Sequence, residues 1–470
     1  MNYPNMIEAK KRSKEKNTKI YDYKYVEIDD SLKGKKYFVR TYGCQMNEHD
    51  GEKIKGILES EGLKETDNIE EADLVILNTC AIRENAHDKV FGYLGLVKKL
   101  KETKNILLGL CGCMAQEENV VNMIKNKYKY VDFVFGTHNL DDMINVINES
   151  IKNERQEIEV YSIEGNICEQ IPEKKDSSIS AWVDIMLGCD KFCTYCIVPY
   201  TRGTQRSRRK EDIINEVKAL KEKGYKEITL LGQNVNAYGK DLYDDYNLAN
   251  LFRDVDKTGI DRIRFVTSHP WDFTDDMIDA IEECPHVMPY IHLPIQSGSN
   301  KILKLMNRSY TKEEYLSLYK KIREKVTNAV ITTDIIVGFP GETEEDFEET
   351  MNVVNECKFD GAYTFIFSPR ENTPAALLKD ETPIEEKEKR LYRLNEKVNE
   401  YSNESNQKLL NTIEECLVIG KSEKDPSKYC GYTKGMKLVN IESDKDIIGK
   451  LVNVEITEAK SFSLDGKACN

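Results

Sequence analysis

Six apolar runs in the middle of the chain alternate with helical patterns, and this alternation constrains the fold more than any other feature. The runs are Trp182–Leu187, Glu227–Leu231, Ile263–Thr267, Met288–His292, Val330–Val337 and Ala362–Phe367. Helical segments such as Glu211–Lys223 and Thr343–Glu356 follow the first five runs. Strands that alternate with helices predict a parallel sheet, and a closed barrel of eight units would need two further units. We therefore predict an α/β protein whose residues 175–405 form an open six-stranded (β/α)6 barrel.

The residues before this barrel show the same alternation on a smaller scale. Helical patterns such as Glu48–Glu61 lie between short apolar runs at Tyr37–Arg40, Leu74–Leu77, Ile106–Leu110 and Val131–Phe135. These runs predict a doubly wound parallel sheet over residues 35–153. Residues 1–34 are charged from Glu8 onward and lack the apolar core of a signal peptide, so we expect a disordered segment. The polar stretch Glu164–Ser178 is expected to be a linker.

The last part of the chain, residues 408–470, carries five short strand-like runs separated by Gly and Asp turns. They are Glu415–Val418, Tyr429–Thr433, Lys437–Ile441, Leu451–Glu458 and Ser461–Leu464. This pattern predicts a small OB-like β-barrel. Ten lysines balance ten acidic residues here, so the net charge of −14 lies upstream. A chain this acidic is not expected to bind nucleic acid indiscriminately, although a neutral barrel is compatible with nucleic-acid binding.

Hydropathy and cysteine usage narrow the class of protein further. No stretch of about 18 uncharged apolar residues occurs, so the sequence predicts no transmembrane helix and no membrane partner. Because no export signal is visible, we expect a cytoplasmic protein, in which the 13 cysteines would stay reduced. Metal, cluster or catalytic chemistry is then expected for some of these cysteines, and buried packing for the others.

Three cysteines lie directly after the first strand-like run of the barrel. Cys189, Cys193 and Cys196 have the spacing CxxxCxxC. Three thiolates in such a loop can bind three irons of one cubane cluster and leave the fourth iron without a protein ligand. An open iron can chelate the amino and carboxylate groups of a small molecule. A structural zinc site would need a fourth ligand, and no further Cys or His follows at zinc-ribbon spacing.

A second group of cysteines is scattered through the N-terminal part. Cys44, Cys80 and Cys113 each follow one of its strand-like runs. The carboxyl ends of parallel strands meet at one crevice of a doubly wound sheet, so these thiols are expected to converge. They could hold a second cluster or be buried packing residues, and position alone leaves both readings open. Cys111 complicates the assignment because it lies two residues from Cys113.

The CxxxCxxC loop after the first strand of a six-unit barrel resembles the radical S-adenosylmethionine (SAM) superfamily. The resemblance implies that the cluster at this loop reduces bound SAM to methionine and a 5′-deoxyadenosyl radical. It also implies that SAM lies at the C-terminal rim of the barrel. The residues expected to contact the cofactor are Gly232, Gln233 and Asn234 after the second strand, Gln296 and Ser297 after the fourth, and Asp334 on the fifth. Each Gly- or Pro-containing cluster could instead be an ordinary βα turn.

Three segments around the scattered cysteines resemble the N-terminal domain of the methylthiotransferase family. They are TYGCQMNEHD (Thr41–Asp50), LNTCAIRENA (Leu77–Ala86) and GCMAQ (Gly112–Gln116). In that family, cysteines that match Cys44, Cys80 and Cys113 bind an auxiliary 4Fe-4S cluster, which leaves Cys111 spare. The C-terminal barrel resembles TRAM, an RNA-binding module. The resemblance covers nearly the whole chain and implies two 4Fe-4S clusters and SAM as cofactors.

Further segments resemble the MiaB-type members of this family, which act on tRNA. They are LLGQNVNAYG (Leu230–Gly239), VPYTRG (Val198–Gly203), TSHP (Thr267–Pro270) and IVGFPGET (Ile336–Thr343). The resemblance implies that a methylthio group is added to C2 of isopentenyladenosine at position 37 of tRNA, next to the anticodon. One SAM would methylate a sulfur at the auxiliary cluster, and a second would supply the radical. Implied partners are tRNA carrying isopentenyladenosine, an electron donor such as flavodoxin or ferredoxin, and a sulfur source.

A basic run follows the first cysteine loop and contains Arg202, Arg206, Arg208 and Arg209. Its place at the mouth of the barrel favours contact with RNA phosphates over a solvated charge run. Two alternative substrates remain within the family, a ribosomal-protein aspartate and a different modified tRNA adenosine. A remote alternative from another class is a non-catalytic RNA-binding protein that one metal ion stabilises.

Overall fold

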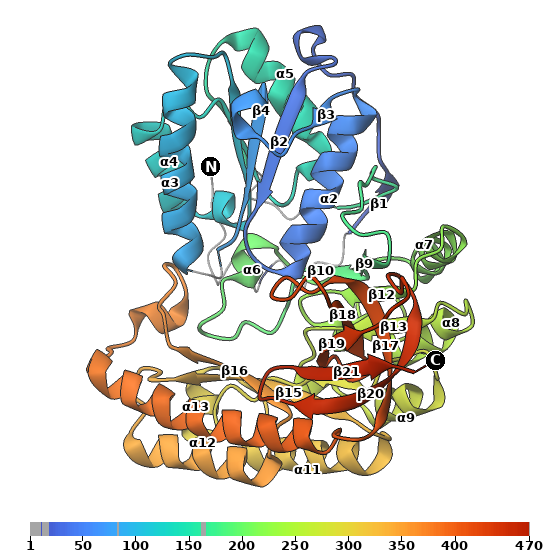
Figure 1. Ribbon diagram of the computed structural model, residues 1–470. Helices are drawn as coiled ribbons and strands as arrows, with labels where there is room; N and C mark the ends of the chain where they lie inside the picture. The colour runs from blue at the N-terminus through green and yellow to red at the C-terminus, as the bar shows by residue number, and fades with distance from the viewer. Residues whose placement is uncertain (1–10, 12–17, 82–83, 161–165, 470) are drawn as a thin grey trace.

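The computed structural model describes residue 11 and residues 18–81, 84–160 and 166–469. Figure 1 shows an α/β part built from the first third of the chain, a larger β/α part beneath it and a small β-barrel packed in front of the second part. In these described ranges, no helix combines the length and the apolar character that crossing a bilayer requires.

The N-terminal part is a parallel sheet with the strand order β3-β2-β4-β5-β6-β7. Its strands are β2 (Lys36–Thr41), β3 (Lys64–Glu65), β4 (Leu74–Thr79), β5 (Leu107–Gly112), β6 (Phe133–Phe135) and β7 (Glu157–Glu159). Helices α2 (Gln45–Ser60) and α5 (Met143–Asn153) cover one face, and α3 (Glu84–Lys101) and α4 (Glu118–Lys127) cover the other. Strand β4 is buried along its whole length, as expected for a strand covered on both faces. The predicted doubly wound sheet is confirmed, with β3 and β7 as additional short strands.

Residues 18–34 belong to the fold, so the prediction of disorder over residues 1–34 is wrong for this portion. Strand β1 (Ile20–Asp22) pairs in parallel with β8 (Ile167–Glu169). Ile28 and Leu32 are buried in the core that α2 and α5 form on the sheet. A few apolar side chains anchor this otherwise charged segment, because they pack into the core between the sheet and helices α2 and α5. Residues 1–10 and 12–17 lie outside the described residues.

The segment predicted as a linker, Glu164–Ser178, is also part of the packing. Its residues 167–169 form β8, and Glu173 and Lys175 make ion pairs with residues of α2. Residues 161–165 lie outside the described residues. The polar composition that suggested a linker therefore reflects a buried ionic contact, which the linear sequence does not distinguish from a solvated loop.

The middle part contains the six predicted parallel strands in two sheets of three. The first sheet has the order β13-β12-β9 and the second β14-β15-β16, and a bridge between Ile263 and Val287 joins them. The strands are β9 (Ser180–Asp184), β12 (Glu227–Leu231), β13 (Arg262–Phe265), β14 (Tyr290–His292), β15 (Val330–Val337) and β16 (Gly361–Ile366). In the described residues β9 and β16 do not pair with each other, so the barrel is open as predicted. Strand β9 ends earlier than expected, because Met186–Leu187 (β10) turns away to pair antiparallel with Arg206–Ser207 (β11).

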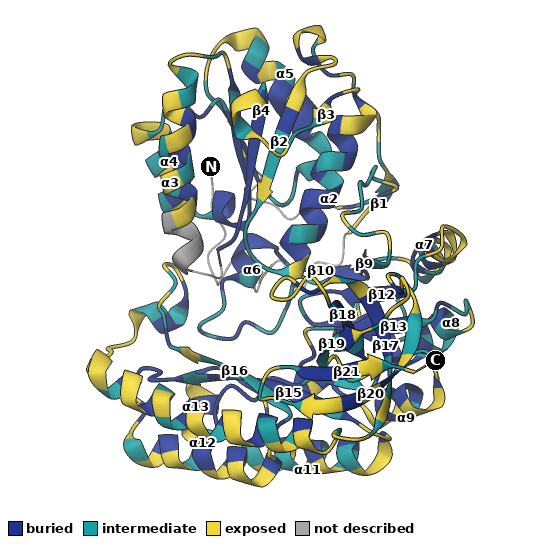
Figure 2. Cartoon of the chain, in the orientation of Figure 1, coloured by how far each residue is buried: buried dark blue, intermediate teal, exposed yellow. Residues whose placement is uncertain are grey.

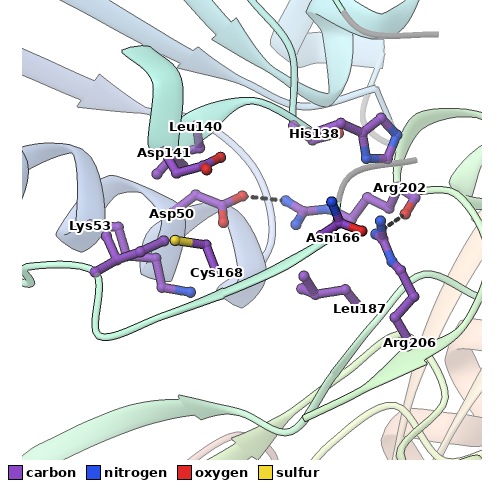
Figure 3. Close-up of a pocket in the computed structure, with 12 residues that line it drawn as sticks. Asp50, Lys53, His138, Leu140, Asp141, Asn166, Cys168, Leu187, Arg202 and Arg206 are labelled. Carbon is purple, nitrogen blue, oxygen red and sulfur yellow. Dashed lines mark hydrogen bonds and ion pairs between the residues drawn. The ribbon is translucent and has the colours of Figure 1, made fainter. Parts of the chain in front are cut away.

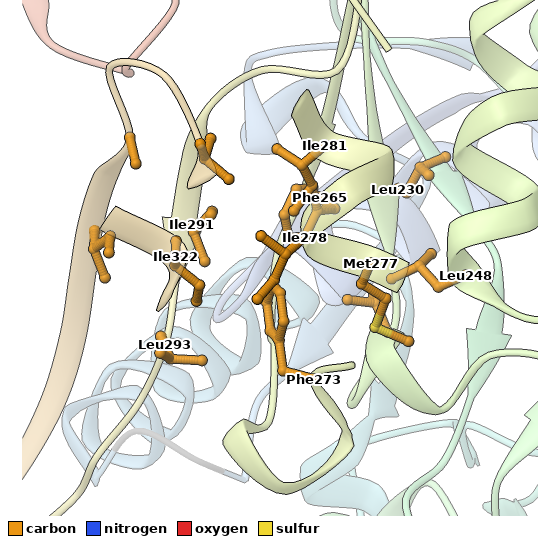
Figure 4. Packing of buried hydrophobic residues seen from close by; sticks show 14 of the residues in the cluster. Leu230, Leu248, Phe265, Phe273, Met277, Ile278, Ile281, Ile291, Leu293 and Ile322 are labelled. Carbon is orange, nitrogen blue, oxygen red and sulfur yellow. The ribbon is translucent and has the colours of Figure 1, made fainter. Parts of the chain in front are cut away.

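Helices cover the outer surface of this half-open barrel and bury its main core. They are α7 (Lys210–Glu222), α8 (Leu248–Asp256), α9 (Asp275–Glu283), α10 (Asn300–Leu305), α11 (Lys312–Lys325), α12 (Glu344–Cys357) and α13 (Ile384–Gln407). The short helix α6 (Val198–Thr201) lies instead at the junction with the N-terminal part (Figure 1). Figure 4 shows Leu230, Phe265 and Ile291 of three strands packed against helix residues such as Ile278 and Ile322. Every second residue of a strand faces this core, so the intervening residues face the lumen. This alternation decides which side chains a bound molecule can reach.

The C-terminal part is a closed five-stranded barrel with the order β17-β18-β19-β21-β20, as predicted. Its strands are β17 (Ile413–Lys421), β18 (Tyr429–Thr433), β19 (Leu438–Glu442), β20 (Leu451–Ala459) and β21 (Leu464–Ala468). The last strand was predicted at Ser461–Leu464 and begins only at Leu464. The residues before it form a turn in which the Lys460 amide donates to the Ser463 carbonyl oxygen.

Two arginines on β13 attach the C-terminal barrel to the larger barrel, at the end where β13 begins. Arg262 is fully buried and donates to the carbonyl oxygens of Tyr432 and Glu415. Arg264 donates to the carbonyl oxygens of Lys434 and Thr433. Figure 2 shows buried residues where the two barrels meet and exposed residues along the outer helices. The opposite end of the larger barrel, at which its strands have their C-terminal ends, therefore faces the N-terminal part.

Candidate active site between two cysteine groups

The CxxxCxxC loop leaves β10 through a tight turn at Gly188. Gly188 has a φ of +75°, and a Cβ there would collide with the Thr204 carbonyl oxygen. Its amide donates to Gln233 Oε1, and the Cys189 amide donates to the Gly203 carbonyl oxygen. These contacts fold the loop back over the rim of the barrel.

The three thiols of this loop lie close enough to interact electrostatically. Burial and then the neighbouring thiols of Cys193 and Cys196 raise the pKa of Cys189. Burial and Cys193 raise the pKa of Cys196 to about 12. Nη1 of Arg308 donates to Sγ of Cys193 at 3.4 Å, so one buried cation faces the thiol group. Sequence reasoning missed Arg308, which follows α10 and carries no motif signal of its own.

The second group, Cys44, Cys80 and Cys113, also converges as predicted. Cys44 caps the N-terminus of α2, Cys80 follows β4 and Cys113 follows β5. Burial, together with the neighbouring thiols of Cys44 and Cys80, raises the pKa of Cys113 to about 12, although the Arg202 guanidinium acts in the opposite direction. A Cβ at Gly43 would lie 2.9 Å from Sγ of Cys80, so glycine permits this close approach of two loops.

Cys111 and Cys113 occupy different environments although they are two residues apart. Cys111 is buried in the apolar core between the sheet and helices α2 and α5. Cys113 packs instead with Ala81, Ile197 and Tyr200, at the junction with the larger barrel. Cys113 therefore lies at the junction and Cys111 does not. That Cys113 is the cluster ligand stays a prediction.

Arg202, which follows the CxxxCxxC loop in the chain, reaches across the junction to the second cysteine group. Its Nε donates to Sγ of Cys113 at 3.3 Å, and its Nη2 donates to Asp50 at 2.6 Å and to Asn47 at 2.7 Å. Asn47 also donates to the carbonyl oxygens of Tyr42 and Thr79, which fixes the ends of β2 and β4. A residue that follows the first cysteine loop in sequence thus reaches the second group directly.

The basic run does not face solvent as the RNA-contact prediction required. Arg202 and Arg206 are 5% and 4% exposed, and Arg206 donates to the Arg202 carbonyl oxygen. Arg208 makes a bidentate contact with Glu169 and a third bond to Glu216. The prediction is wrong for these three arginines, because buried carboxylates and carbonyl groups bind them. Arg209 is exposed beside Asp212, and its contact with RNA stays a prediction.

Rim residues expected to contact the cofactor divide into two sets. Gln233 Nε2 and Asn234 Oδ1 are buried without a hydrogen-bond partner, and both follow β12 at the rim. Asn234 uses its Nδ2 to bind Asp272 at 2.6 Å, which fixes its orientation. Gly232 packs against Met186, where a Cβ would not fit. Unpaired polar atoms at this rim fit a polar ligand, because burying them without one is costly.

The remaining rim residues have protein partners. Gln296 has a φ of +71° and pairs through its backbone with Asp334 and Ile336 of β15. Asp334 ion-pairs with His292 at 3.3 Å. Ser297 is fully buried and its hydroxyl lies 3.4 Å from that of Thr350, and its contact with the cofactor stays a prediction.

The chemistry of both cysteine groups fits iron–sulfur clusters. Each offers three converging thiols with a guanidinium donor beside a sulfur, and cluster ligation by thiolates is stabilised by such hydrogen bonds. Burial favours the neutral thiols in the absence of metal, so cluster binding would release protons. Within the described residues, neither group shows a fourth cysteine in the set, which leaves one iron of a cubane without a protein ligand.

A cavity of about 70 Å³ lies at the junction between the N-terminal part and the larger barrel (Figure 3). Asp50 and Arg202, which are bound to each other, line it together, and Arg206 and Leu187 form the side contributed by the barrel. A larger cavity of about 470 Å³ adjoins it and shares Lys53, among other residues. The junction beside Cys113 is therefore hollowed and lined by charged groups.

Family comparisons support this architecture. Residues 36–136 match the Uncharacterized protein family UPF0004, residues 183–354 match the Radical SAM superfamily, and residues 407–469 match the TRAM domain. Among solved structures, the radical S-adenosylmethionine methyltransferase TsrM from Kitasatospora setae superimposes with a TM-score of 0.56 at 13% identity. The match covers 73% of this chain and 75% of that chain and shows a shared fold.

Full-length relatives are much more similar. A tRNA-2-methylthio-N(6)-dimethylallyladenosine synthase from Oceanobacillus iheyensis is 53% identical and is matched over 98% of this chain and 90% of its own length. Proteins of the same name are 53% identical in Bacillus cytotoxicus, over 99% of this chain and 92% of that protein, and 51% identical in Staphylococcus aureus, over 98% and 91%. The barrel and its cysteine loop define a radical SAM enzyme. Within that class, the chain belongs to the family of tRNA-2-methylthio-N(6)-dimethylallyladenosine synthases.

Proposed function

We propose that this chain adds a methylthio group to C2 of isopentenyladenosine (dimethylallyladenosine) at position 37 of tRNA. The observation that supports the proposal is the contact of Arg202, which follows the CxxxCxxC loop in the chain, with Sγ of Cys113 in the N-terminal part. A reaction that needs both a radical and a sulfur donor requires two such sites at one junction. Relatives named for this product match the chain along nearly its whole length.

Each cysteine group has a distinct role in this proposal. Cys189, Cys193 and Cys196 hold the cluster that binds SAM, and Cys44, Cys80 and Cys113 hold the auxiliary cluster. When bound, the two clusters and SAM supply a radical and an activated methylthio group. The chain itself positions these groups through Arg308 and Arg202, which donate to one sulfur of each set.

The rim of the barrel orients the SAM amino acid moiety. Gln233 Nε2 and Asn234 Oδ1 are the buried polar atoms that lack partners there, so they are free to bind its carboxylate and amino groups respectively. Gly232 and Gln296 shape the backbone of the same rim, and Asp334 lies below it. Because these groups are held by the sheet, they need little reorganisation when the cofactor binds.

Further partners follow from the reaction rather than from contacts in the chain. The substrate is tRNA that already carries isopentenyladenosine, and the TRAM barrel is the part proposed to bind it outside the active site. An electron donor such as flavodoxin or ferredoxin reduces the first cluster, and a separate sulfur source replenishes the auxiliary one. We place this chemistry in the cytoplasm, where tRNA is available. A ribosomal-protein aspartate is disfavoured as substrate because the relatives are named for a tRNA product.

The test is a nucleoside analysis of tRNA from a strain that lacks this gene. We expect 2-methylthio-dimethylallyladenosine to disappear and dimethylallyladenosine to accumulate, with return of the product when the wild-type gene is restored. Restoration with a Cys113→Ala variant should not return it, whereas a Cys430→Ala variant should, because Cys430 lies in the C-terminal barrel away from both sites. Unchanged nucleosides in the deletion strain would contradict the proposal.

A further inference from the structure

Two aromatic side chains on the last strand of the larger barrel are unusually exposed. Tyr363 and Phe365 of β16 are 56% and 52% exposed, whereas the other residues of the strand are half-buried. The alternate residues Ala362 and Ile366 pack against the outer core, and Thr364 bonds to Asn395 of α13. Because side chains alternate along a strand, Tyr363 and Phe365 point away from α13, into the lumen.

The neighbouring strands give this aromatic pair a polar side and an apolar side. The ring of Tyr363 lies edge-on to that of His292, with centroids 5.8 Å apart, and His292 ion-pairs with Asp334. Phe365 stands next to Ile336 in the register of β15 and β16. A molecule placed here meets two aromatic rings and an aliphatic side chain, with the His292 imidazole and the Asp334 carboxylate beside the Tyr363 ring.

This aromatic pair lies close to the cysteine loop and is reachable from outside. Ile336 and Tyr195, the latter between two cysteines of the loop, pack against the same apolar cluster, which includes Phe339 and Phe367. Strand β16 pairs only with β15 among the described residues, so it forms the free edge of the open barrel. A substrate that enters through the open side therefore passes Tyr363 and Phe365 on its way to the loop.

We propose that Tyr363 and Phe365 bind the dimethylallyl group of the substrate adenosine and so select prenylated tRNA over unmodified tRNA. The inference rests on the proposed function, which supplies the substrate class. The dimethylallyl group is a flat apolar chain of five carbons, and it is the part that distinguishes this adenosine from an ordinary one. Large exposed apolar side chains at one place indicate a binding surface, and removal of this chain from water onto two rings favours the prenylated base.

Measurements of tRNA binding distinguish this role from a contact of the two rings with the adenine of SAM. The dissociation constants of two tRNAs, identical except for the dimethylallyl group, would be measured with the wild-type protein and with Phe365→Ala and Tyr363→Ala. We expect the wild-type protein to prefer the prenylated tRNA, and each variant to reduce that preference about tenfold. The dissociation constant of SAM should stay the same, and Phe365→Leu, which keeps an apolar side chain, should retain most of the preference.

A matched control is Tyr392→Ala, because Tyr392 is 66% exposed on the outer helix α13 and should leave the preference unchanged. Equal binding of the two tRNAs by the wild-type protein would overturn the inference, as would an unchanged preference in both alanine variants. A weaker affinity for SAM in place of a lost tRNA preference would assign the rings to the cofactor and would also overturn it. Conversion of prenylated tRNA, assayed separately, shows whether the proposed function itself holds.

Discussion

Nε of Arg202 in the larger barrel lies 3.3 Å from Sγ of Cys113 in the N-terminal part, and the same guanidinium binds Asp50 at 2.6 Å. The contact makes the geometry of one cysteine group depend on the packing of the other part of the chain. Both side chains of the ion pair are largely buried, at 6% and 13% exposure. Loss of Arg202 would leave the buried Asp50 carboxylate without the guanidinium that binds it.

We therefore predict that Arg202→Gln lowers the free energy of unfolding by about 3–5 kcal/mol, because Asp50 remains as a buried unpaired charge. Arg209→Gln is the matched control. Arg209 pairs with Asp212 at the surface and should contribute less than about 1 kcal/mol. Urea unfolding of the three proteins measures both values, and similar small losses in the two variants would contradict the role given to Arg202.

The environments of Cys111 and Cys113 predict opposite results for two neighbouring substitutions. Cys111→Ala should keep the iron of the N-terminal site, because its side chain faces the apolar core. Cys113→Ala should lose about four irons of an expected total near eight. Iron analysis of the anaerobically reconstituted proteins distinguishes them. Loss of iron in Cys111→Ala with retention in Cys113→Ala would mean that the two roles are exchanged.

A buried histidine between the two parts predicts a pH dependence of stability. His49 lies 2.8 Å from Asp184 through Nδ1 and 3.1 Å from Glu173 through Nε2. Burial alone would lower the pKa of His49, but the carboxylates of Asp184 and Glu173 outweigh it and raise the pKa above 6.5. Lys53 and Lys175 face the same group and stay charged across the range concerned. Sequence reasoning missed this ionic group, although His49 lies within the motif segment Thr41–Asp50.

A pKa raised in the folded state stabilises the protein fully below the unfolded value of 6.5, and this stabilisation is lost as pH rises through the folded pKa. The free energy of unfolding should therefore fall as pH rises from about 6.5 toward the alkaline range. In His49→Gln this decline should be reduced. Denaturant unfolding at several pH values is the measurement, and equal slopes in the two proteins would show that His49 does not contribute.

Exposed lysines of the C-terminal barrel provide a test of its role in tRNA binding. Lys424 and Lys445 lie in the β17–β18 and β19–β20 connections and are exposed. If both contact phosphates, the Lys424→Glu and Lys445→Glu double variant should raise the KM for tRNA. It should also reduce the log–log salt slope of binding by roughly 0.7–0.9 for each lost contact.

The control for these lysines is Lys218→Glu on the outer helix α7. Point variants are preferable to deletion of residues 408–470, because deletion would remove the partners of the buried Arg262 and disturb the larger barrel. A salt slope in the double variant equal to that of the control would exclude these two lysines as phosphate contacts.

The sequence predicted the features that depend on local periodicity and on spacing. Strand Tyr429–Thr433 has the predicted bounds. Cys44, Cys80 and Cys113 converge because parallel strands end at the same side of a sheet. The predictions that were wrong concern residues whose contacts are distant in the chain. Arg208 was predicted to contact RNA because the sequence does not show that Glu169 binds it. Ile28 was predicted to be disordered because the sequence does not show the core against which it packs.

The most direct test of the account is an in vitro assay with the anaerobically reconstituted protein, SAM, a reductant and tRNA carrying dimethylallyladenosine. Nucleoside mass analysis should show 2-methylthio-dimethylallyladenosine with the wild-type protein and with Cys430→Ala. Neither Cys189→Ala nor Cys113→Ala should form it, because each lacks one ligand of a different cluster. Product formation by either of these two variants, or no product with a wild-type protein that holds about eight irons, would contradict the account.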